Sequence, residues 1–280
     1  MSLKFSLVLA TIERTKELER FLDSLNNQTY KNFELIIIDQ NKDDRLKSIL
    51  KNYAFSIKHL TSEKGLSKAR NVGLKHVTGD VVAFPDDDCW YPNDLLFKLN
   101  QHFNSSPKVD GITGVARDEN HQLSSNKWHK KNGTLCKKTV WNRAISFTVF
   151  LKSHTLKSVN QFDETLGVGA QTPWGSGEET DFLIRTLNKG LCISYKKELF
   201  VFHPSPVSAY NQKSNIRAKN YGMGFGKVLR KHQYSKLFVL RTLLRPILGI
   251  LLSLCVINIP RAKFYYNVFI GRLIGYSSNT

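Results

Sequence analysis

The sequence has no acidic residue in its C-terminal part. Residues 199–280 contain no Asp or Glu but contain twelve Lys and Arg, so two thirds of the net charge of +18 lies in this segment. A charge asymmetry of this kind predicts an anionic partner, either a lipid surface or nucleic acid.

Cysteine is scarce, and its spacing forms no motif. The chain has four cysteines, and none of them forms a CxxC pair or a zinc-type spacing with histidine. This pattern predicts a reduced, cytosolic chain. Before Glu13 and Arg14 the N-terminal end has only six apolar or small residues in a row, residues 5–10, which is too short for a secretory signal.

Long hydrophobic runs are absent as well. The longest uncharged run in the basic segment, residues 246–260, has 15 residues and a proline at each end, whereas a membrane-spanning helix needs about 20 apolar residues. We therefore expect residues 206–280 to form a basic amphipathic helical region that lies in the membrane interface, with Lys and Arg reaching the lipid headgroups. The alternative is a pair of C-terminal helices buried against the rest of the protein.

Hydrophobic periodicity in the first 85 residues alternates between strand and helix. Strands are expected at residues 5–11, 33–38, 55–60 and 81–84, with helices between them at residues 15–27, 46–53 and 66–76. This alternation predicts an α/β fold with a mostly parallel sheet flanked by helices. No GxGxxG motif follows the first strand, so a dinucleotide-binding fold is not supported.

Beyond residue 85 the pattern is less regular. A polar, Lys- and Asn-rich stretch at residues 118–140 has little periodicity and predicts a mobile loop. A glycine-rich loop at residues 167–177 leads into a helix. The elements expected here are helices at 92–103, 178–188, 209–232 and within 237–276, and strands at 111–116, 145–151, 192–195 and 200–202.

The chain is organised around three consecutive carboxylates that follow the strand at residues 81–84. Pro85 ends the strand, and Asp86, Asp87 and Asp88 come directly after it. Open α/β sheets bind ligands at the carboxyl ends of their strands. Adjacent carboxylates repel one another unless a cation neutralises them, and Mg²⁺ typically takes one or two carboxylates together with substrate phosphates. The sequence thus favours a metal–phosphate site over its alternative, a solvated acidic turn.

Other polar residues occupy similar positions. Asp39 ends the second strand and either accepts hydrogen bonds from a ribose or base or caps its own loop as an Asx turn. His203 ends the last strand and is either a ligand or a satisfied strand-end histidine. Glu178 and Glu179 form an acidic pair at the start of an expected helix, and Ser176 and Glu179 also match a capping box.

Five motifs, in this order, resemble the family 2 glycosyltransferases with the GT-A fold. Together they cover about residues 3–205. They are SLVLAT at residues 6–11, NQTY at 27–30 with FELIIID at 33–39, GLSKARNVG at 65–73, GDVVAFPDDD at 79–88, and WGSGEETDF at 174–182.

The resemblance implies a role for each matching position. Two departures stand out: Glu179 occupies the place of the family's usual aspartate base, and Gln40-Asn41 follow Asp39 where relatives commonly have Asp-Gly-Ser. If Glu179 only caps its helix, Glu178 or Asp181 would be the base. The implied sets are Glu179, Glu178 and Asp181 for catalysis; Thr11, Glu13, Asp39, Arg70, Asp86 and Asp87 for the nucleotide-sugar; Asp88, Asp86 and His203 for Mn²⁺ or Mg²⁺; and Trp174 and Gly175 for the acceptor.

The resemblance predicts an inverting, metal-dependent glycosyltransferase. Residues 1–205 would form the GT-A domain, and residues 206–280 a peripheral membrane segment on the inner face of the cell membrane. The expected donor is a nucleotide-sugar, a UDP-sugar in particular, and the expected acceptor is a hydroxyl of a lipid-linked or surface glycan. Anionic lipid, and not nucleic acid, would be the partner of the basic segment.

Two other functions remain as alternatives at this point. A sugar-nucleotide nucleotidylyltransferase would need a glycine-rich phosphate loop after the first strand, but residues 10–14 contain no glycine. A non-enzymatic polyanion binder would use the basic segment alone, and three carboxylates at a strand end would repel its ligand.

Overall fold

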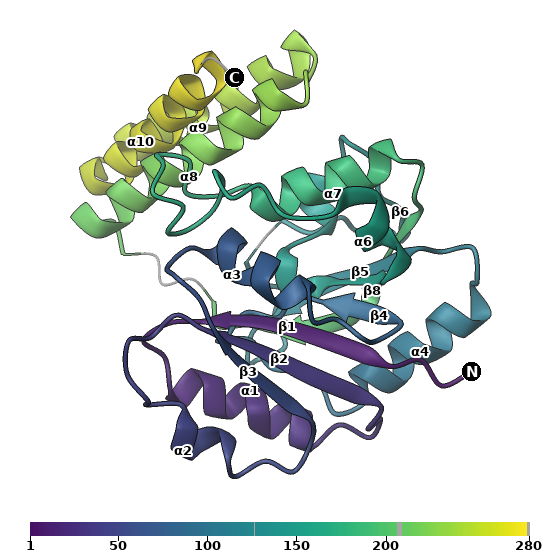
Figure 1. The fold of residues 1–280 in the computed structure, drawn as a ribbon. Coiled ribbons are helices and arrows are strands. Elements are labelled where there is room, and N and C mark those ends of the chain that lie inside the picture. The colour runs from purple at the N-terminus through teal and green to yellow at the C-terminus, as the bar shows by residue number, and fades with distance from the viewer. Residues whose placement is uncertain (126, 206–208, 279–280) are drawn as a thin grey trace. The chain divides into compact units, whose positions relative to one another are not determined.

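The computed structural model describes residues 1–125, 127–205 and 209–278, and its core is an eight-stranded mixed sheet (Figure 1). The strand order is β3-β2-β1-β4-β7-β5-β8-β6. The strands are β1 (Phe5–Thr11), β2 (Phe33–Asp39), β3 (Ile57–Thr61), β4 (Val81–Ala83), β5 (Gly111–Arg117), β6 (Gly133–Thr134), β7 (Val149–Lys152) and β8 (Ile193–Phe202).

The predicted α/β class and mostly parallel sheet are confirmed. Strands β1 to β4 pair in parallel, β5 pairs in parallel with β8, and β7 is antiparallel to both β4 and β5. Both faces of β1 and β2 are buried, because Leu7, Val8 and Leu9 in β1 and residues 36–38 in β2 are at most 1% exposed. Near-continuous apolar strands of this kind are typical of the centre of a parallel sheet covered by helices.

The register brings the polar strand ends together. Thr11 pairs with Asp39, Asp39 pairs with Thr61, and Ala10 forms an isolated parallel bridge with Asp86. The carboxyl ends of β1, β2 and β4 therefore lie at one edge of the sheet, where the sequence places its candidate ligands.

The helices are largely those expected from periodicity, with shifts at their ends. Helix α4 begins at Leu95 instead of near Pro92. The helices up to residue 188 are α1 (Lys16–Asn26), α2 (Lys47–Leu50), α3 (Leu66–Leu74), α4 (Leu95–Ser105), α5 (Val140–Arg143), α6 (His154–Val159) and α7 (Glu178–Asn188).

Three other expectations are corrected. The two short strands expected at 192–195 and 200–202 are one continuous strand, β8, because the chain stays extended between them and its pairing with β5 resumes after a register shift between Thr113 and Val115. The strand expected at 145–151 begins as a 3₁₀ turn, Ser146–Thr148, before β7. The stretch at 118–140 contains β6 and buries Trp128 and Leu135, so part of it packs in the core.

The chain divides into two compact units. The first consists of residues 1–64, 68–162 and 182–206, and the second of residues 65–67, 163–181 and 207–280. The predicted boundary at 205/206 falls at Pro206, outside the described residues. The second unit thus contains the glycine-rich loop as well as the C-terminal helices, and the division into a catalytic and a membrane-associating domain stays a prediction.

The C-terminal helices of the second unit are α8 (Gln212–Lys231), α9 (Lys236–Cys255) and α10 (Ile259–Ser277). Helices α8 and α10 approach closely at glycines, since a Cβ on Gly226 or Gly275 would overlap the backbone of the other helix. Pro246 was expected at the start of the apolar run 246–260, but it lies inside α9, so the apolar helix extends on both sides of it. By length and composition, α9 is able to cross a membrane, which the run at residues 246–260 alone did not indicate.

Candidate active site

Asp86, Asp88 and His203 form a cluster at the carboxyl ends of β4 and β8. Their ligand atoms all lie within 4.8 Å of one another. The two aspartates are in the turn after β4, and a two-way backbone bridge between Trp90 and Phe202 ties that turn to the end of β8. This bridge is the reason that a histidine 115 positions beyond Asp88 reaches it.

The cluster fits a divalent cation. His203 Nδ1 lies 2.8 Å from the carbonyl oxygen of Pro204, and Nε2 lies 3.3 Å from Asp88 Oδ1. If Nδ1–H donates to that carbonyl, the Nε2 lone pair points toward the carboxylates, as in metal-ligating histidines. The ring also stacks on Phe147 at 4.7 Å. Carboxylate oxygens with one imidazole are suitable ligands for Mn²⁺ or Mg²⁺.

Asp87 has a different environment from its two neighbours. Its side chain accepts a hydrogen bond from Thr11 Oγ1 at 2.7 Å and pairs with Arg14 at 2.6 Å. Burial raises the pKa of Asp87 to about 6, although Arg14 and Thr11 act to lower it. Thr11 and Asp87, both predicted to contact the nucleotide-sugar, therefore contact each other and join β1 to the aspartate turn.

Arg14 was not among the predicted site residues. Its guanidinium lies 2.6 Å from Asp87 and 2.6 Å from Asp88, so it bridges two adjacent carboxylates. Burial raises the pKa of Asp88, but its hydrogen bond with His203 and the charges of His203 and Arg14 outweigh this and lower it to about 2. The sequence signal was only that Arg14 follows the first strand.

Arg70, on α3, holds Asp86. Its side chain is 1% exposed and donates from Nη2 to Asp86 Oδ1 at 3.1 Å. The guanidinium also lies over the ring of Phe162, 5.4 Å from its centroid. Ser146 Oγ makes a further, longer hydrogen bond to the same oxygen, at 3.4 Å. Arg70 was predicted to lie near the diphosphate, and the structure gives it a direct contact with Asp86, one of the candidate metal ligands.

Asp39 is at the centre of a second polar group on the same sheet edge. It is 3% exposed, and its Oδ1 accepts hydrogen bonds from the backbone and side-chain amides of Asn41. Its Oδ2 lies 3.0 Å from His59 Nε2, on β3. Asn41 in turn accepts from the backbone N–H of Glu13, which has a φ of 62°.

The two interpretations of Asp39 are thus compatible. Oδ1 caps the loop as an Asx turn, while Oδ2 and His59 form a polar pair suited to a ribose or base. Sequence reasoning missed His59 because the weak alternation of its strand gave no hint that it pairs with β2. Asn41 was noticed only as a departure from the family pattern, and it is the residue that links Asp39 to Glu13.

The candidate bases belong to the second unit. Glu178 is 6% exposed and packs against Gly167, whereas Glu179 is half-buried. Asp181 is fully buried and lies 2.8 Å from both Lys231 Nζ and His232 Nε2. Asp181 therefore has a structural pairing with the end of α8, which leaves Glu179 as the more accessible carboxylate.

The glycine-rich loop with Trp174 and Gly175 packs along α8. The Gly175 N–H donates to the Asn220 carbonyl at 3.2 Å, and Ser176 Oγ donates to the Tyr221 carbonyl at 2.9 Å. Lys227 Nζ lies 4.3 Å from the centroid of the Trp174 ring. Burial raises the pKa of Tyr221, Arg217 acts to lower it, and the nearby charges of Glu178 and Glu179 raise it by smaller amounts, so this tyrosine is a further polar neighbour of the candidate bases.

Comparisons with known proteins bear on the family and the fold of this chain. The family model of Glycosyl transferase family 2 matches residues 6–161. A Campylobacter jejuni protein described as GalNAc(5)-diNAcBac-PP-undecaprenol beta-1,3-glucosyltransferase is 29% identical over 182 residues, which are 61% of this chain and 58% of that protein. The chain thus spans less than two thirds of this relative's length.

Two solved structures share the fold. Staphylococcus aureus TarS residues 1–349, in complex with UDP-GlcNAc, has a TM-score of 0.63 at 18% identity, covering 96% of this chain and 90% of that one. The mannosyltransferase PcManGT from Pyrobaculum calidifontis, in complex with GDP-Man and Mn²⁺, has a TM-score of 0.64 at 15% identity, covering 98% and 88%. Since the family model matches more than half of the chain, the protein belongs to glycosyl transferase family 2 and has the GT-A fold.

Proposed function

We propose that the protein is an inverting, metal-dependent glycosyltransferase that moves a sugar from a UDP-sugar to a hydroxyl of a lipid-linked glycan. The observation that carries this proposal is the cluster of Asp86, Asp88 and His203 on the same sheet edge as the Asp39–His59 pair. The nucleotide-sugars named with TarS and PcManGT, and the acceptor named for the Campylobacter relative, support these substrate classes.

Different residues of this chain would have different roles in the reaction. Asp86, Asp88 and His203 would hold Mn²⁺ or Mg²⁺, which supplies the Lewis acid that neutralises the leaving diphosphate. Arg70 keeps the Asp86 carboxylate oriented, and Arg14 does so for Asp88. Asp39 and His59 offer an acceptor and a ring nitrogen to the nucleoside.

Glu179 is the proposed general base. It would take the proton from the acceptor hydroxyl as the hydroxyl oxygen attacks the anomeric carbon and the nucleoside diphosphate leaves. A direct displacement with one base inverts that carbon, whereas double displacement would need a second carboxylate as nucleophile. Buried Asp181, paired with Lys231 and His232, is less suited to either role.

Donor hydrolysis tests the function. With a panel of UDP-, GDP-, ADP- and dTDP-sugars we expect slow release of the nucleoside diphosphate from one UDP-sugar in the presence of Mn²⁺. Excess EDTA should abolish the release, and added Mn²⁺ should restore it. Calorimetric titration of each nucleotide with and without Mn²⁺ covers the case in which turnover requires an acceptor. The absence of both turnover and metal-dependent nucleotide binding would contradict the proposed function.

We also propose that the C-terminal helices attach the enzyme to the inner face of the cell membrane. Large apolar side chains on α9 and at its junction with α10 are exposed, among them Leu248 (58%), Leu252 (63%) and Ile257 (84%). The same segment is rich in Lys and Arg without acids. Apolar surface of this kind beside basic residues is typical of helices that enter an anionic interface.

Vesicle sedimentation tests this attachment. We expect the protein to bind vesicles that contain phosphatidylglycerol. The double change Leu252→Glu/Ile257→Glu should weaken binding by at least about tenfold, because each apolar side chain that becomes buried in the membrane contributes about 1.5–3 kcal/mol to the binding free energy. Phe97→Glu is the matched control, since Phe97 is an exposed aromatic residue (45%) on α4 of the other unit. Equal binding by all three proteins would rule out membrane contact through this junction.

A further inference from the structure

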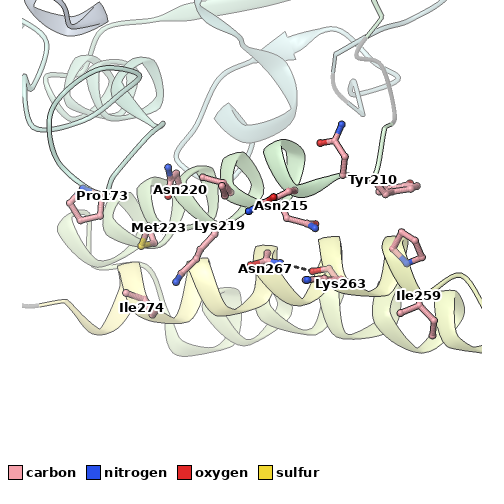
Figure 2. Close-up of a pocket in the computed structure, with 14 residues that line it drawn as sticks. Pro173, Tyr210, Asn215, Lys219, Asn220, Met223, Ile259, Lys263, Asn267 and Ile274 are labelled. Atoms are coloured by element: carbon pink, nitrogen blue, oxygen red, sulfur yellow. Dashed lines mark hydrogen bonds between the residues drawn. The ribbon is translucent and has the colours of Figure 1, made fainter.

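The second unit contains a long groove between α8 and α10, shown in Figure 2. Its volume is about 940 Å³, which is at the upper end of the range for small-molecule pockets. Pro173, next to Trp174 in the glycine-rich loop, lines one end, and Ile259 lines the other. We refer to this cavity as the amide groove, because five of its lining residues carry side-chain amides: Asn211, Gln212, Asn215, Asn220 and Asn267.

The charge of the amide groove indicates an anionic ligand. Lys219 and Lys263 line it, and no Asp or Glu does. Among the residues that the structure describes, neither lysine has a carboxylate within salt-bridge distance. Two ammonium groups on facing helices, without acids around them, are suited to the oxygens of a phosphate or diphosphate.

A buried amide oxygen indicates that the ligand also carries hydroxyl groups. The Oδ1 atom of Asn215 has less than 1 Å² of accessible surface and no hydrogen-bond donor among the described residues. A buried amide oxygen without a hydrogen-bond donor destabilises the folded protein, and a donor from a bound ligand would remove this penalty. Phosphate oxygens accept hydrogen bonds and do not satisfy this atom, whereas a sugar hydroxyl does.

The lining residues are ordered along the groove. In Figure 2, Tyr210 and Ile259 lie at one end, Lys263, Asn215, Lys219 and Asn267 follow, and Asn220, Met223 and Pro173 lie at the other end. The Ile259 end is continuous in sequence with the exposed apolar junction, where Val256 is 65% and Ile257 is 84% exposed. The Pro173 end adjoins the loop that leads into Glu179. The order is therefore the apolar Ile259 end, a middle stretch in which lysines and amides alternate, and then the loop before the candidate base.

We propose that the amide groove binds the phosphate groups and the proximal sugar of a lipid-linked glycan diphosphate, with the lipid at the Ile259 end. This assignment of the acceptor site rests on the proposed function. Lys219 and Lys263 contact the phosphates, and Asn215 accepts a hydrogen bond from a sugar hydroxyl. The glycan then extends toward Pro173 and the glycine-rich loop.

Calorimetry with a soluble short-chain probe, farnesyl-diphosphate-linked N-acetylglucosamine, tests the proposal on the full chain without donor or metal. We expect Lys219→Met/Lys263→Met to raise the Kd of the probe by at least about tenfold, because each change removes a charge-assisted contact. Lys213→Met is the matched control: Lys213 is exposed on the same helix but does not line the groove. It should change the Kd less than twofold.

Two further arms identify which part of the ligand is recognised. Asn215→Leu should weaken binding of the probe but not of farnesyl diphosphate, which has no sugar. Dihexanoyl-phosphatidylglycerol at the same concentrations should bind far more weakly than the probe. Circular dichroism and thermal melting of each variant establish that it is folded.

The outcomes separate this proposal from the proposed function. No binding of the probe to the wild type, or equal Kd values for the wild type and the double variant, overturns the groove assignment even if the donor panel shows a UDP-sugar transferase. Phosphatidylglycerol binding that matches the probe overturns it in favour of a bilayer headgroup site. If the probe binds as expected but no donor is hydrolysed or bound, the transferase proposal fails, and the amide groove remains a binding site for a lipid-linked glycan diphosphate but not an acceptor site.

Discussion

Asp88→Ala is expected to reduce sugar transfer by about a thousandfold or more. Asp88 is the carboxylate that faces His203 Nε2 at 3.3 Å, and its removal takes away one of the three ligand groups in the cluster. A Lewis acid at the leaving group contributes several kcal/mol to transition-state stabilisation, and each 1.36 kcal/mol is tenfold in rate. Initial rates with saturating donor and Mn²⁺ measure the effect.

The control and a second measurement make this prediction specific. Asp94→Ala removes an aspartate whose side chain is 46% exposed and pairs at the surface with Lys98, and it should leave the rate unchanged within about twofold. Titration of Mn²⁺ should show binding to the wild type that Asp88→Ala weakens strongly. A variant that keeps both its rate within tenfold of the wild type and its affinity for Mn²⁺ would exclude Asp88 as a metal ligand.

Glu179→Gln is expected to reduce transfer to the acceptor by about 10²–10⁴-fold, the usual contribution of a positioned general base. The glutamine has nearly the same shape but does not take up the hydroxyl proton. Donor affinity should be unchanged, so the loss should appear in kcat at saturating donor. Glu179→Asp should keep more activity than the glutamine variant, since the resemblance to the family implies an aspartate at this position.

Asp181→Asn distinguishes the catalytic role from a structural one. Asp181 is fully buried between Lys231 and His232, and breaking a buried pair by removing one charge typically costs about 3–5 kcal/mol. We therefore expect this variant to lower the melting temperature, whereas Glu179→Gln should not. A loss of activity in Asp181→Asn without a loss of stability, with Glu179→Gln fully active, would transfer the base assignment to Asp181.

Many of the strands and helices of the first unit can be predicted from local sequence patterns. Strands β1, β2 and β4 and helices α1 and α3 lie close to the ranges that periodicity predicts, because each is a continuous segment whose own residues decide which face is buried. The same holds for the aspartate turn after β4, which is set by Pro85 and the end of the apolar run. Strand β8 was predicted as two pieces because its middle, at residues 196–198, is polar, and residues 197 and 198 are exposed.

The second unit was less predictable. Periodicity gave the helices, but the membership of residues 163–181 in the same unit depends on contacts of Gly175 and Ser176 with α8, which no local pattern encodes. Pro246 is another example. In sequence it bounds an apolar run, but α9 continues through it and reaches a length that is sufficient to cross a membrane.

The sequence by itself determined the α/β class, the family, the three carboxylates at a strand end and the basic, acid-free C-terminal part. Only the tertiary structure decided that Arg14 bridges Asp87 and Asp88, that His59 faces Asp39, and that α8 and α10 enclose a groove with Lys219, Lys263 and Asn215. The physical reason is the distance along the sequence over which each kind of interaction acts. Burial patterns and turn residues act over a few positions, whereas strand pairing, glycine-mediated helix contacts and ion pairs join segments tens of residues apart, and their partners are fixed only when the whole chain packs.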